Sequence, residues 1–299
     1  MRSSASLPPR RESGSSPRGR SAKRSPEKPP LRPEEAQRIV GLLQPLTSER
    51  RIVLIGGQAV AFWLRYLASI YIEAEGVEPL ASKDIDFEGA SRTVLLAAEL
   101  IAGEPKLPTM DDQTPNTGLV MFKDADGVDR QIDFLDQPLG LRGRDVRDTA
   151  VLVEMPQRDA VPAVQVWIMH PERCMESRVA NAAILGKTHE LAMRQLKASI
   201  LCARLWSRYV LDNEELPLAE RVRAVLRINE RIFRRCHREK PFRDVVLDYD
   251  VDPFDAVLIE DTRLPAAFRD RRYPQMQRLL GQRLSADRRN RARAVARRA

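Results

Sequence analysis

Three short stretches decide the expected fold: Leu54-Ile55-Gly56-Gly57-Gln58-Ala59-Val60, Ser82-Lys83-Asp84-Ile85-Asp86-Phe87 and Arg130-Gln131-Ile132-Asp133-Phe134-Leu135. Side chains alternate between the two faces of a strand, so Asp84 and Asp86 leave the same face with their Cα atoms about 6.6 Å apart. Ile85 and Phe87 then point toward the core. Asp133 also lies between apolar residues, so a neighbouring strand can bring a third carboxylate beside the first two.

Three carboxylates at one edge of a sheet repel one another unless they share a cation, and hard oxygen ligands suit Mg²⁺ held together with substrate phosphates. The sequence therefore predicts a metal site at Asp84, Asp86 and Asp133. A glycine pair between a strand and a helix lets backbone N–H groups approach an anion at the positive end of the helix. A triphosphate is the natural guest of Gly56 and Gly57. The alternatives are a surface strand with solvated aspartates and a glycine pair that only makes a tight turn.

The ordered set of motifs resembles the signature of the nucleotidyltransferase (polymerase-beta-like) superfamily. In that signature a glycine pair follows an apolar residue, Asp-x-Asp lies in an apolar strand, and a lone Asp lies in a later apolar strand. The matching residues are Gly56-Gly57, Asp84-x-Asp86 and Asp133. The resemblance covers about residues 48–136 and is greatest to the bacterial branch that includes AbiEii-like toxins and small uncharacterised nucleotidyltransferases. The sequence departs from the family in having Gly-Gly where Gly-Ser is commoner, and Ser82-Lys83 before the aspartate pair.

The resemblance implies an Mg-dependent enzyme that moves a nucleoside monophosphate from a nucleoside triphosphate to an acceptor hydroxyl. In that mechanism Asp84 and Asp86 would hold two Mg²⁺ ions that bridge the triphosphate. Asp133 would bind the second ion and help to deprotonate the attacking hydroxyl, and pyrophosphate would leave. The acceptor stays open between RNA such as tRNA, a protein and a small molecule, and so do a toxin-like role and a cognate antitoxin partner. The alternative is a non-catalytic protein of the same fold that has a regulatory role or binds nucleic acid.

A basic stripe is expected on a long helix from Lys187 to Tyr209. At 100° per residue the stripe consists of Arg194, Lys197, Arg204 and Arg208, with Lys187 beside it. In the functional interpretation the cations that would contact the triphosphate are Lys83, Lys187, Arg194 and Lys197. The alternative is a solvated helix face.

The chain has 299 residues and 43% hydrophobic content, which is enough for one large or two small cores. Its net charge of +8 is uneven, because residues 1–32 carry nine Lys or Arg against two Glu and residues 284–299 carry six Arg against one Asp, which leaves −4 for the body between them. We expect an α+β chain with a mixed sheet and flanking helices. Its four parts would be a disordered basic tail (1–32), a nucleotidyltransferase catalytic lobe (33–165), a helical lobe (166–283) and a basic tail (284–299).

The composition disfavours several other protein classes. The three cysteines have no Cys-x-x-Cys spacing, so neither a disulfide framework nor a zinc site is indicated, and a cytoplasmic setting fits. The longest apolar stretch, Leu54 to Ile72, contains two glycines, Gln58 and Arg65, and favours a strand and a buried helix over a membrane span. No membrane contact is expected. Nucleic-acid binding by charge would rest on the tails, where the Arg-rich end has no aromatic residue for base stacking.

Hydrophobic periodicity and turn residues predict the remaining elements. The predicted helices cover 33–46, 91–103, 218–236 and 272–284, and another begins at Pro171 after His170, a capping or packing residue. The predicted strands cover 51–55, 118–122, 128–135, 150–155 and 161–169. The acidic turn Asp124–Gly127 lacks the terminal Glu of a calcium-binding EF-hand loop, so it favours a hairpin between two of these strands.

Overall fold

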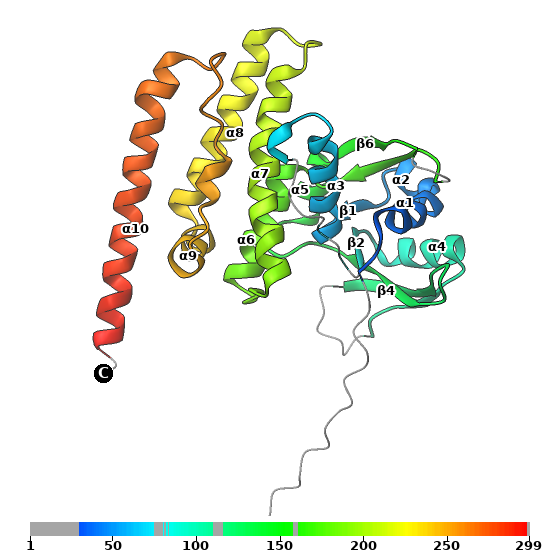
Figure 1. The fold of residues 1–299 in the computed structure, drawn as a ribbon. Coiled ribbons are helices and arrows are strands. Elements are labelled where there is room, and N and C mark those ends of the chain that lie inside the picture. The colour runs from blue at the N-terminus through cyan, green and yellow to red at the C-terminus, as the bar shows by residue number, and fades with distance from the viewer. Residues whose placement is uncertain are drawn as a thin grey trace, which may run out of the picture.

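The computed structural model describes residues 30–74, 80, 82, 84–109, 116–157 and 161–297. Nearly all of the predicted tail 1–32 lies outside these ranges, as do Lys83 and the last two residues of the chain. The described chain forms a mixed seven-stranded sheet with flanking helices, followed by a group of packed helices (Figure 1). The expectation of a mixed sheet with helices around and after it is confirmed at this level.

The first half of the chain builds most of the sheet. Its elements are α1 (Pro33–Leu42), α2 (Gln44–Ser48), β1 (Val53–Ile55), α3 (Gly56–Ala68), a 3₁₀ turn (Ile72–Ala74), β2 (Ile85–Glu88), α4 (Ser91–Ile101), β3 (Glu104–Lys106), β4 (Asn116–Lys123) and β5 (Asp129–Leu135). The second half completes the sheet and then becomes helical. Its elements are α5 (Gly143–Thr149), β6 (Val151–Met155), β7 (Val164–Ile168), α6 (Pro171–Ala183), α7 (Glu190–Asp212), α8 (Leu218–Arg238), α9 (Lys240–Tyr249), a 3₁₀ turn (Pro253–Ala256), a π-helical turn (Phe268–Arg272) and α10 (Tyr273–Ala296).

The strands lie in the order β3-β4-β5-β2-β1-β7-β6. β2 runs parallel to β5 and β1 runs parallel to β7, whereas the other neighbouring pairs are antiparallel. The three strands that carry the sequence motifs, β1, β2 and β5, are therefore adjacent in the middle of the sheet. This central place suits their apolar residues, because a central strand can be covered on both faces.

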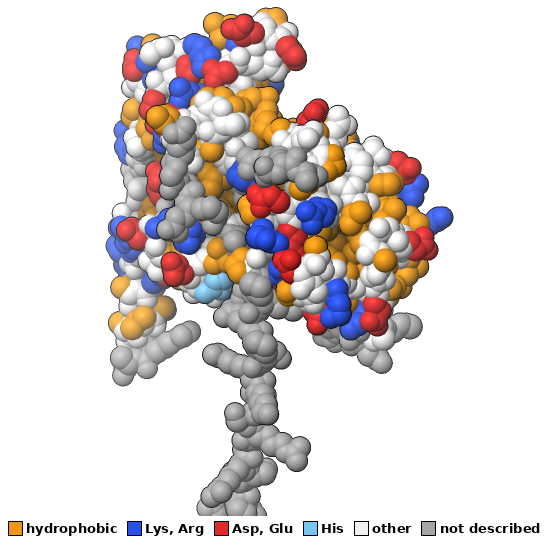
Figure 2. All heavy atoms as spheres, turned by 45° about the vertical axis from the view of Figure 1, so that its right-hand side comes forward, with side chains coloured by type: hydrophobic (Ala, Val, Ile, Leu, Met, Phe, Trp, Pro, Cys, Tyr) orange, Lys and Arg blue, Asp and Glu red, His pale blue; other side chains and the backbone are white. Residues whose placement is uncertain are grey.

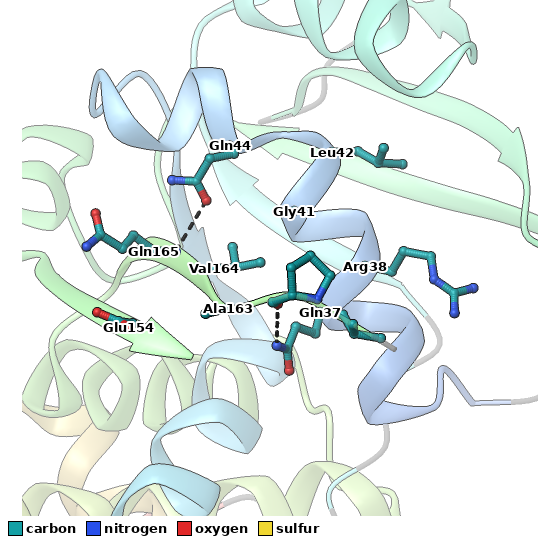
Figure 3. A pocket seen from close by; sticks show the side chains of 11 residues that line it. Gln37, Arg38, Gly41, Leu42, Gln44, Glu154, Ala163, Val164 and Gln165 are labelled. Atoms are coloured by element: carbon teal, nitrogen blue, oxygen red, sulfur yellow. Dashed lines mark hydrogen bonds between the residues drawn. The ribbon is translucent and has the colours of Figure 1, made fainter. Parts of the chain in front are cut away.

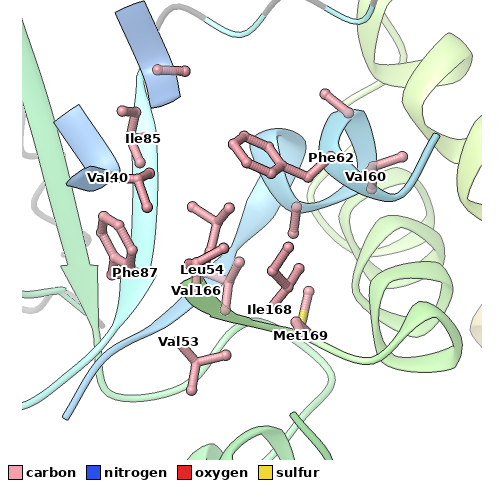
Figure 4. Close-up of a cluster of buried hydrophobic side chains, with 14 of the residues drawn as sticks. Val40, Val53, Leu54, Val60, Phe62, Ile85, Phe87, Val166, Ile168 and Met169 are labelled. Carbon is pink, nitrogen blue, oxygen red and sulfur yellow. The ribbon is translucent and has the colours of Figure 1, made fainter. Parts of the chain in front are cut away.

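One face of these central strands forms the hydrophobic core. Leu54 pairs with Phe87, and Phe87 pairs with Phe134, so the three side chains leave the same face and all are fully buried. The rings of Phe87 and Phe134 stack with their centroids 5.8 Å apart. Figure 4 shows Val40 from α1 beside Ile85 and Phe87 in this core. The alternate residues of β2 and β5 therefore point away from it.

A second buried cluster holds the C-terminal helices together. The first cluster runs through the sheet and reaches Leu205 on α7, whereas the second runs from Met175 on α6 to Leu284 on α10. Helices α6 and α7 thus contribute to both and join the sheet to the remaining helices. Figure 1 shows α10 on the side farthest from the sheet. Within the described ranges no helix combines the length and the apolar character that a membrane crossing requires.

Histidines mark the starts of α6 and α7. His170 caps α6, as expected, because its Nδ1 accepts a hydrogen bond from the N–H of Glu172 at 3.2 Å. His189 does the same for α7, accepting from the N–H of Ala192 at 3.3 Å. The helix predicted from Lys187 therefore begins three residues later, at Glu190. This later start leaves Lys187 in the connection between the two helices.

Other elements differ from the sequence predictions. β3, α5 and α9 are not predicted, since β3 is a short exposed strand that contains a proline, and α5 and α9 are too short to show a clear period. The last helix continues beyond its predicted end at Leu284 to Ala296. Alanine and arginine are strong helix formers, so this second half of α10 is helical although it has no apolar stripe.

A buried ion cluster, here named the hairpin cluster, consists of Glu35, Asp124 and Arg130 and lies at the β4–β5 turn. Arg130 Nε donates to Asp124 Oδ2 at 2.8 Å, and Arg130 Nη2 lies 3.4 Å from Glu35 Oε2. Asp124 Oδ1 also accepts from the N–H groups of Asp126 and Val128 at 2.9 and 2.8 Å, which builds the predicted hairpin turn. Burial raises the pKa of Asp124, but its hydrogen bonds, with that from Val128 the largest, outweigh burial and lower the pKa to about 2.

Candidate active site

Asp86 and Asp133 are direct neighbours in the middle of the sheet. The parallel strands β2 and β5 are in register at this pair, and neighbouring strands lie about 4.8 Å apart. Both side chains leave the face opposite to Phe87 and Phe134. Oδ1 of Asp133 accepts a hydrogen bond from Nε2 of Gln131 at 2.7 Å. The fold thus brings together two carboxylates that are far apart in the sequence.

The third predicted carboxylate, Asp84, is half-buried in the bend that leads into β2. Burial raises the pKa of the half-buried Asp86 carboxyl to about 6. The guanidinium of Arg178 opposes this rise more strongly than any other charge. Asp133 and Asp84 add to the rise, and Lys187 opposes it more weakly. Asp86 therefore lies among two negative and two positive side chains.

Gly56 brings the start of α3 against the carboxylate of Asp86. Ile55 pairs with Asp86 in the antiparallel β1–β2 ladder, and α3 begins at the next residue. Gly56 has a φ of 71°, a conformation that residues with a side chain rarely adopt. A Cβ atom on Gly56 would lie 2.0 Å from Oδ2 of Asp86. The glycine is therefore required both by the backbone and by the space that the carboxylate occupies.

Gly57 approaches a different side chain, which the sequence prediction does not include. A Cβ atom on Gly57 would lie 2.4 Å from Nε2 of Gln195, a buried residue on α7. Oε1 of Gln195 accepts a hydrogen bond from Nη1 of Arg178 on α6 at 3.1 Å. Arg178 is also absent from the prediction, although the sequence carries a signal for it. A cation four residues after Cys174, in a helix that begins at Pro171, falls on the face that carries the buried residues.

A cavity of about 380 Å³ lies in front of Asp86. Its polar lining residues are Asp86, Asn116, Gln137, Ser177, Arg178, Asn181 and Lys187. The rest of the lining is mainly apolar and comes from Ile55, Leu135 and the segment 138–141. This is the size of a small-molecule site, and a largely apolar wall with a few convergent polar groups is typical of such sites. The cavity sets one carboxylate opposite two cations.

The predicted triphosphate cations do not all reach this cavity. Lys187 is exposed and lines it, from the α6–α7 connection. Arg194 and Lys197 lie on α7 and are not among its lining residues, so their contact with a triphosphate stays a prediction. The orientation of α7 turns Gln195 toward Gly57 at the start of α3 and leaves Lys197 exposed. Lys83 lies outside the described residues.

Arg204 and Arg208, the C-terminal half of the predicted basic stripe, lie on another surface. Arg204 Nη1 lies 3.5 Å from Glu260 Oε1, and Arg208 Nη1 donates to Glu73 Oε1 at 2.6 Å. These residues line a separate cleft of about 560 Å³ in which acidic and basic groups are already paired. On the face in Figure 2, Lys and Arg side chains are likewise interspersed with Asp and Glu, so no field of one sign marks it.

Another hollow, of about 500 Å³, lies beside α1 and β7 (Figure 3). Gln37 uses its Nε2 to donate to the backbone oxygens of Pro156 and Pro162 at 2.9 and 3.1 Å. Glu154 is the sole acidic side chain that lines this hollow within the described part of the chain. Among the described residues the smaller cavity is also lined by a single carboxylate, but that carboxylate, Asp86, has Asp133 as its neighbour in register, so the chemistry favours the smaller cavity.

Asp86 lines the cavity, and Asp84 and Asp133 lie beside Asp86 without being lining residues. These carboxylates fit a hard divalent cation in their chemistry. Carboxylate oxygens are the ligands that Mg²⁺ prefers, and Asp86 and Asp133 are adjacent. A divalent cation would relieve the repulsion that Asp84 and Asp133 exert on Asp86. The described residues include no preformed group of three His, Cys, Asp or Glu side chains at ligand spacing. The carboxylates therefore match Mg²⁺ in ligand type and in charge, and not as a preformed coordination site.

Comparisons with known proteins add little to this geometry. No protein-family model matches the chain, and no curated protein matches it. A solved structure described as the crystal structure of JHP933 from Helicobacter pylori is similar to it at 17% sequence identity. The similarity covers 87% of this chain and 95% of that one with a TM-score of 0.35, which is too low to carry an argument.

Proposed function

We propose that this chain is an Mg-dependent nucleotidyltransferase of the nucleotidyltransferase fold, with its active site in the cavity at Asp86. The observation that carries the proposal is the register of β2 and β5, which places Asp86 beside Asp133. Gly56 touches the same carboxylate from the start of α3, and Lys187 faces it across the cavity. Phosphoryl transfer needs little more than positioning and charge stabilisation, and these groups supply both.

The metal ligands in this proposal are Asp84, Asp86 and Asp133. When bound, Mg²⁺ neutralises charge on the triphosphate and polarises the phosphate that is attacked. Asp133 accepts the proton of the acceptor hydroxyl, and the acceptor oxygen forms a bond to the α-phosphorus. The bond from the α-phosphorus to the bridging oxygen then breaks, and pyrophosphate leaves.

The remaining residues of the cavity hold the substrate. N–H groups in the first turn of α3, at Gly56 and Gly57, face the phosphates, because a helix N-terminus favours an anion. Lys187 contacts a phosphate as a mobile point charge at the cavity mouth. The apolar wall at Ile55 and Leu135 covers the nucleoside. Acceptors that remain candidates are RNA such as tRNA, a protein hydroxyl and a small molecule.

The test incubates the purified protein with each α-labelled nucleoside triphosphate, Mg²⁺, and either total RNA or a protein extract. Label should move to one acceptor class, and EDTA should stop the transfer. Asp86→Asn and Asp133→Asn should abolish it. Asp129→Asn is the matched control, because Asp129 is an exposed carboxylate on the same strand as Asp133 and pairs with Lys123 at 2.8 Å.

Two negative results have different meanings. Nucleoside triphosphate binding without transfer to any acceptor would favour the alternative, a non-catalytic regulatory protein of the same fold. Failure to bind both Mg²⁺ and every nucleoside triphosphate would remove the cavity at Asp86 from consideration. Equal loss of transfer in Asp129→Asn and Asp133→Asn would contradict the assignment of Asp133.

A further inference from the structure

A half-buried arginine, Arg178, lines the cavity without an ion pair to Asp86. The Nε of Arg178 is buried and has no hydrogen-bond partner within the described residues. Its charge nevertheless favours the ionised form of Asp86 more than any other charge does. Burial lowers the pKa of Arg178 itself, and Asp86 acts against that shift. Even partial burial of a cation that has no direct counter-ion is costly.

Gln195 fixes the position of this arginine. The Gln195 side chain is buried, and its Nε2 reaches the backbone at Gly57 while its Oε1 accepts from Nη1 of Arg178 at 3.1 Å. A neutral amide holds the guanidinium without cancelling its charge. Arg178 is therefore kept within reach of the cavity, with N–H groups left for another acceptor.

We propose that Arg178 supplies the positive charge near Asp86 when no metal is bound, and that it binds a phosphate of the incoming triphosphate. The inference rests on the proposed function, because it takes the cavity as a triphosphate site. Without a triphosphate the guanidinium repels a divalent cation from Asp86. A bound triphosphate pairs with the guanidinium and cancels its field, so the metal binds more tightly. Binding free energies are reciprocal, so the metal strengthens triphosphate binding by the same factor.

The decisive experiment measures two affinities by calorimetry in wild type and in Arg178→Met. The first ligand is Mg²⁺ alone, and the second is inorganic triphosphate in EDTA, which avoids any choice of nucleobase. Removing the cation should raise the Mg²⁺ affinity by about tenfold or more, because a like charge is removed from a poorly solvated site. It should lower the triphosphate affinity by about 10- to 150-fold, the usual effect of losing a charge-assisted contact.

Three further variants separate charge from position. Arg178→Lys keeps the charge, so the Mg²⁺ affinity should stay near that of wild type. Gln195→Leu removes the acceptor that holds Arg178, so triphosphate binding should weaken with no gain in Mg²⁺ affinity. Arg144→Met is the matched loss of one cation, because Arg144 is exposed on α5 and is not a lining residue of the cavity. It should change each affinity by less than about twofold.

Opposite shifts of the two affinities in Arg178→Met support the inference. A loss of both affinities would overturn it, provided that melting of the variant in EDTA shows a folded protein. An unchanged Mg²⁺ affinity would overturn it as well, and so would a similar gain in Arg144→Met. If wild type binds neither Mg²⁺ nor triphosphate, the proposed function has failed. If wild type binds both and no opposite shifts occur, only the role of Arg178 is wrong.

Discussion

The hairpin cluster and the carboxylates at the cavity are built from the same side-chain types but differ in how the charges meet. In the hairpin cluster Arg130 Nε lies 2.8 Å from Asp124, and backbone N–H groups occupy the other oxygen. At the cavity Arg178 donates to Gln195, and within the described residues Asp86 forms no ion pair. The pKa of Asp124 is accordingly lowered to about 2, whereas that of Asp86 is raised to about 6.

The difference shows how direct contact separates a carboxylate that is satisfied within the fold from one that, in the proposed function, binds a metal. A carboxylate whose oxygens are all satisfied is stabilised in its charged form and has no capacity left for a ligand. A half-buried carboxylate that makes no direct ion pair keeps its oxygens for a metal or a proton. Four measurements test this contrast between the two sites, and they are given in order of decreasing effect.

The largest effect is expected for Asp86→Asn. Transfer activity should fall by about 10³-fold or more, since the substitution removes a metal ligand and a charge that acts on the reacting phosphate. The melting temperature in EDTA should hold or rise, because one of several mutually repelling carboxylates becomes neutral. Labelled-nucleotide transfer and melting in EDTA measure the two outcomes. A marked drop in melting temperature would make Asp86 structural, like Asp124.

The reverse result is expected for Asp124→Asn. The free energy of unfolding should fall by roughly 3 kcal/mol, because the buried Arg130 would lose its nearer counter-ion and keep only Glu35, at 3.4 Å. Transfer activity per folded molecule should not change. Urea unfolding and activity corrected for the folded fraction measure this. A loss of activity with unchanged unfolding would mean that the hairpin cluster acts on the reaction.

The pH dependence of stability should have opposite signs at the two sites. The folded pKa of Asp86 is raised to about 6, so wild type should lose stability relative to Asp86→Asn as the pH rises from about 4 to about 6. A folded pKa of about 6 sets an upper limit of about 3 kcal/mol on this loss of stability, and partial exposure of Asp86 reduces it to about 1–2 kcal/mol. Urea unfolding of both proteins in EDTA between pH 4 and pH 8 gives the difference.

For Asp124 the folded pKa is lowered to about 2, so its contribution is present above about pH 4 and is lost as the pH falls through 2. The difference between wild type and Asp124→Asn should therefore shrink on acidification. A pH-independent difference in either pair of proteins would show that direct contact does not distinguish the two sites.

The smallest effects concern the cations. Lys187→Ala should weaken nucleoside triphosphate binding by about tenfold, because Lys187 lines the cavity and its charge acts on Asp86. Arg208→Ala should change it by less than about twofold, since Arg208 already pairs with Glu73. Equal effects would indicate a diffuse field rather than a contact. Titration at two ionic strengths would distinguish these cases, because a diffuse field is screened by salt.

Much of the fold could be predicted from local sequence. Alternation placed Asp86 and Phe87 on opposite faces of β2, and Pro171 marked the start of α6 in both prediction and structure. The turn at Asp124 followed from its residue types and a side chain that caps the backbone. These features depend on neighbours within a few residues, which is why they can be predicted.

The features that could not be predicted depend on packing between segments that are distant in the sequence. The register that places Asp133 beside Asp86 belongs to two strands that are not consecutive in the chain. Arg178 reaches the cavity because α6 packs against α7, whose Gln195 accepts a hydrogen bond from it. Lys197 was predicted from helical periodicity, which gives the angle between residues but not which side of α7 meets the sheet.

The order of the strands also has a consequence for synthesis. Asp86 is made about 90 residues before Arg178. At about 5–20 residues per second, the interval between them is about 5–18 s. During it β1, β2 and β5 can pair, but the cation and the amide that complete the cavity do not yet exist. A growing chain therefore contains Asp84, Asp86 and Asp133 well before Arg178 and Gln195 have been added. Any activity of the cavity can appear only once α6 and α7 have been translated.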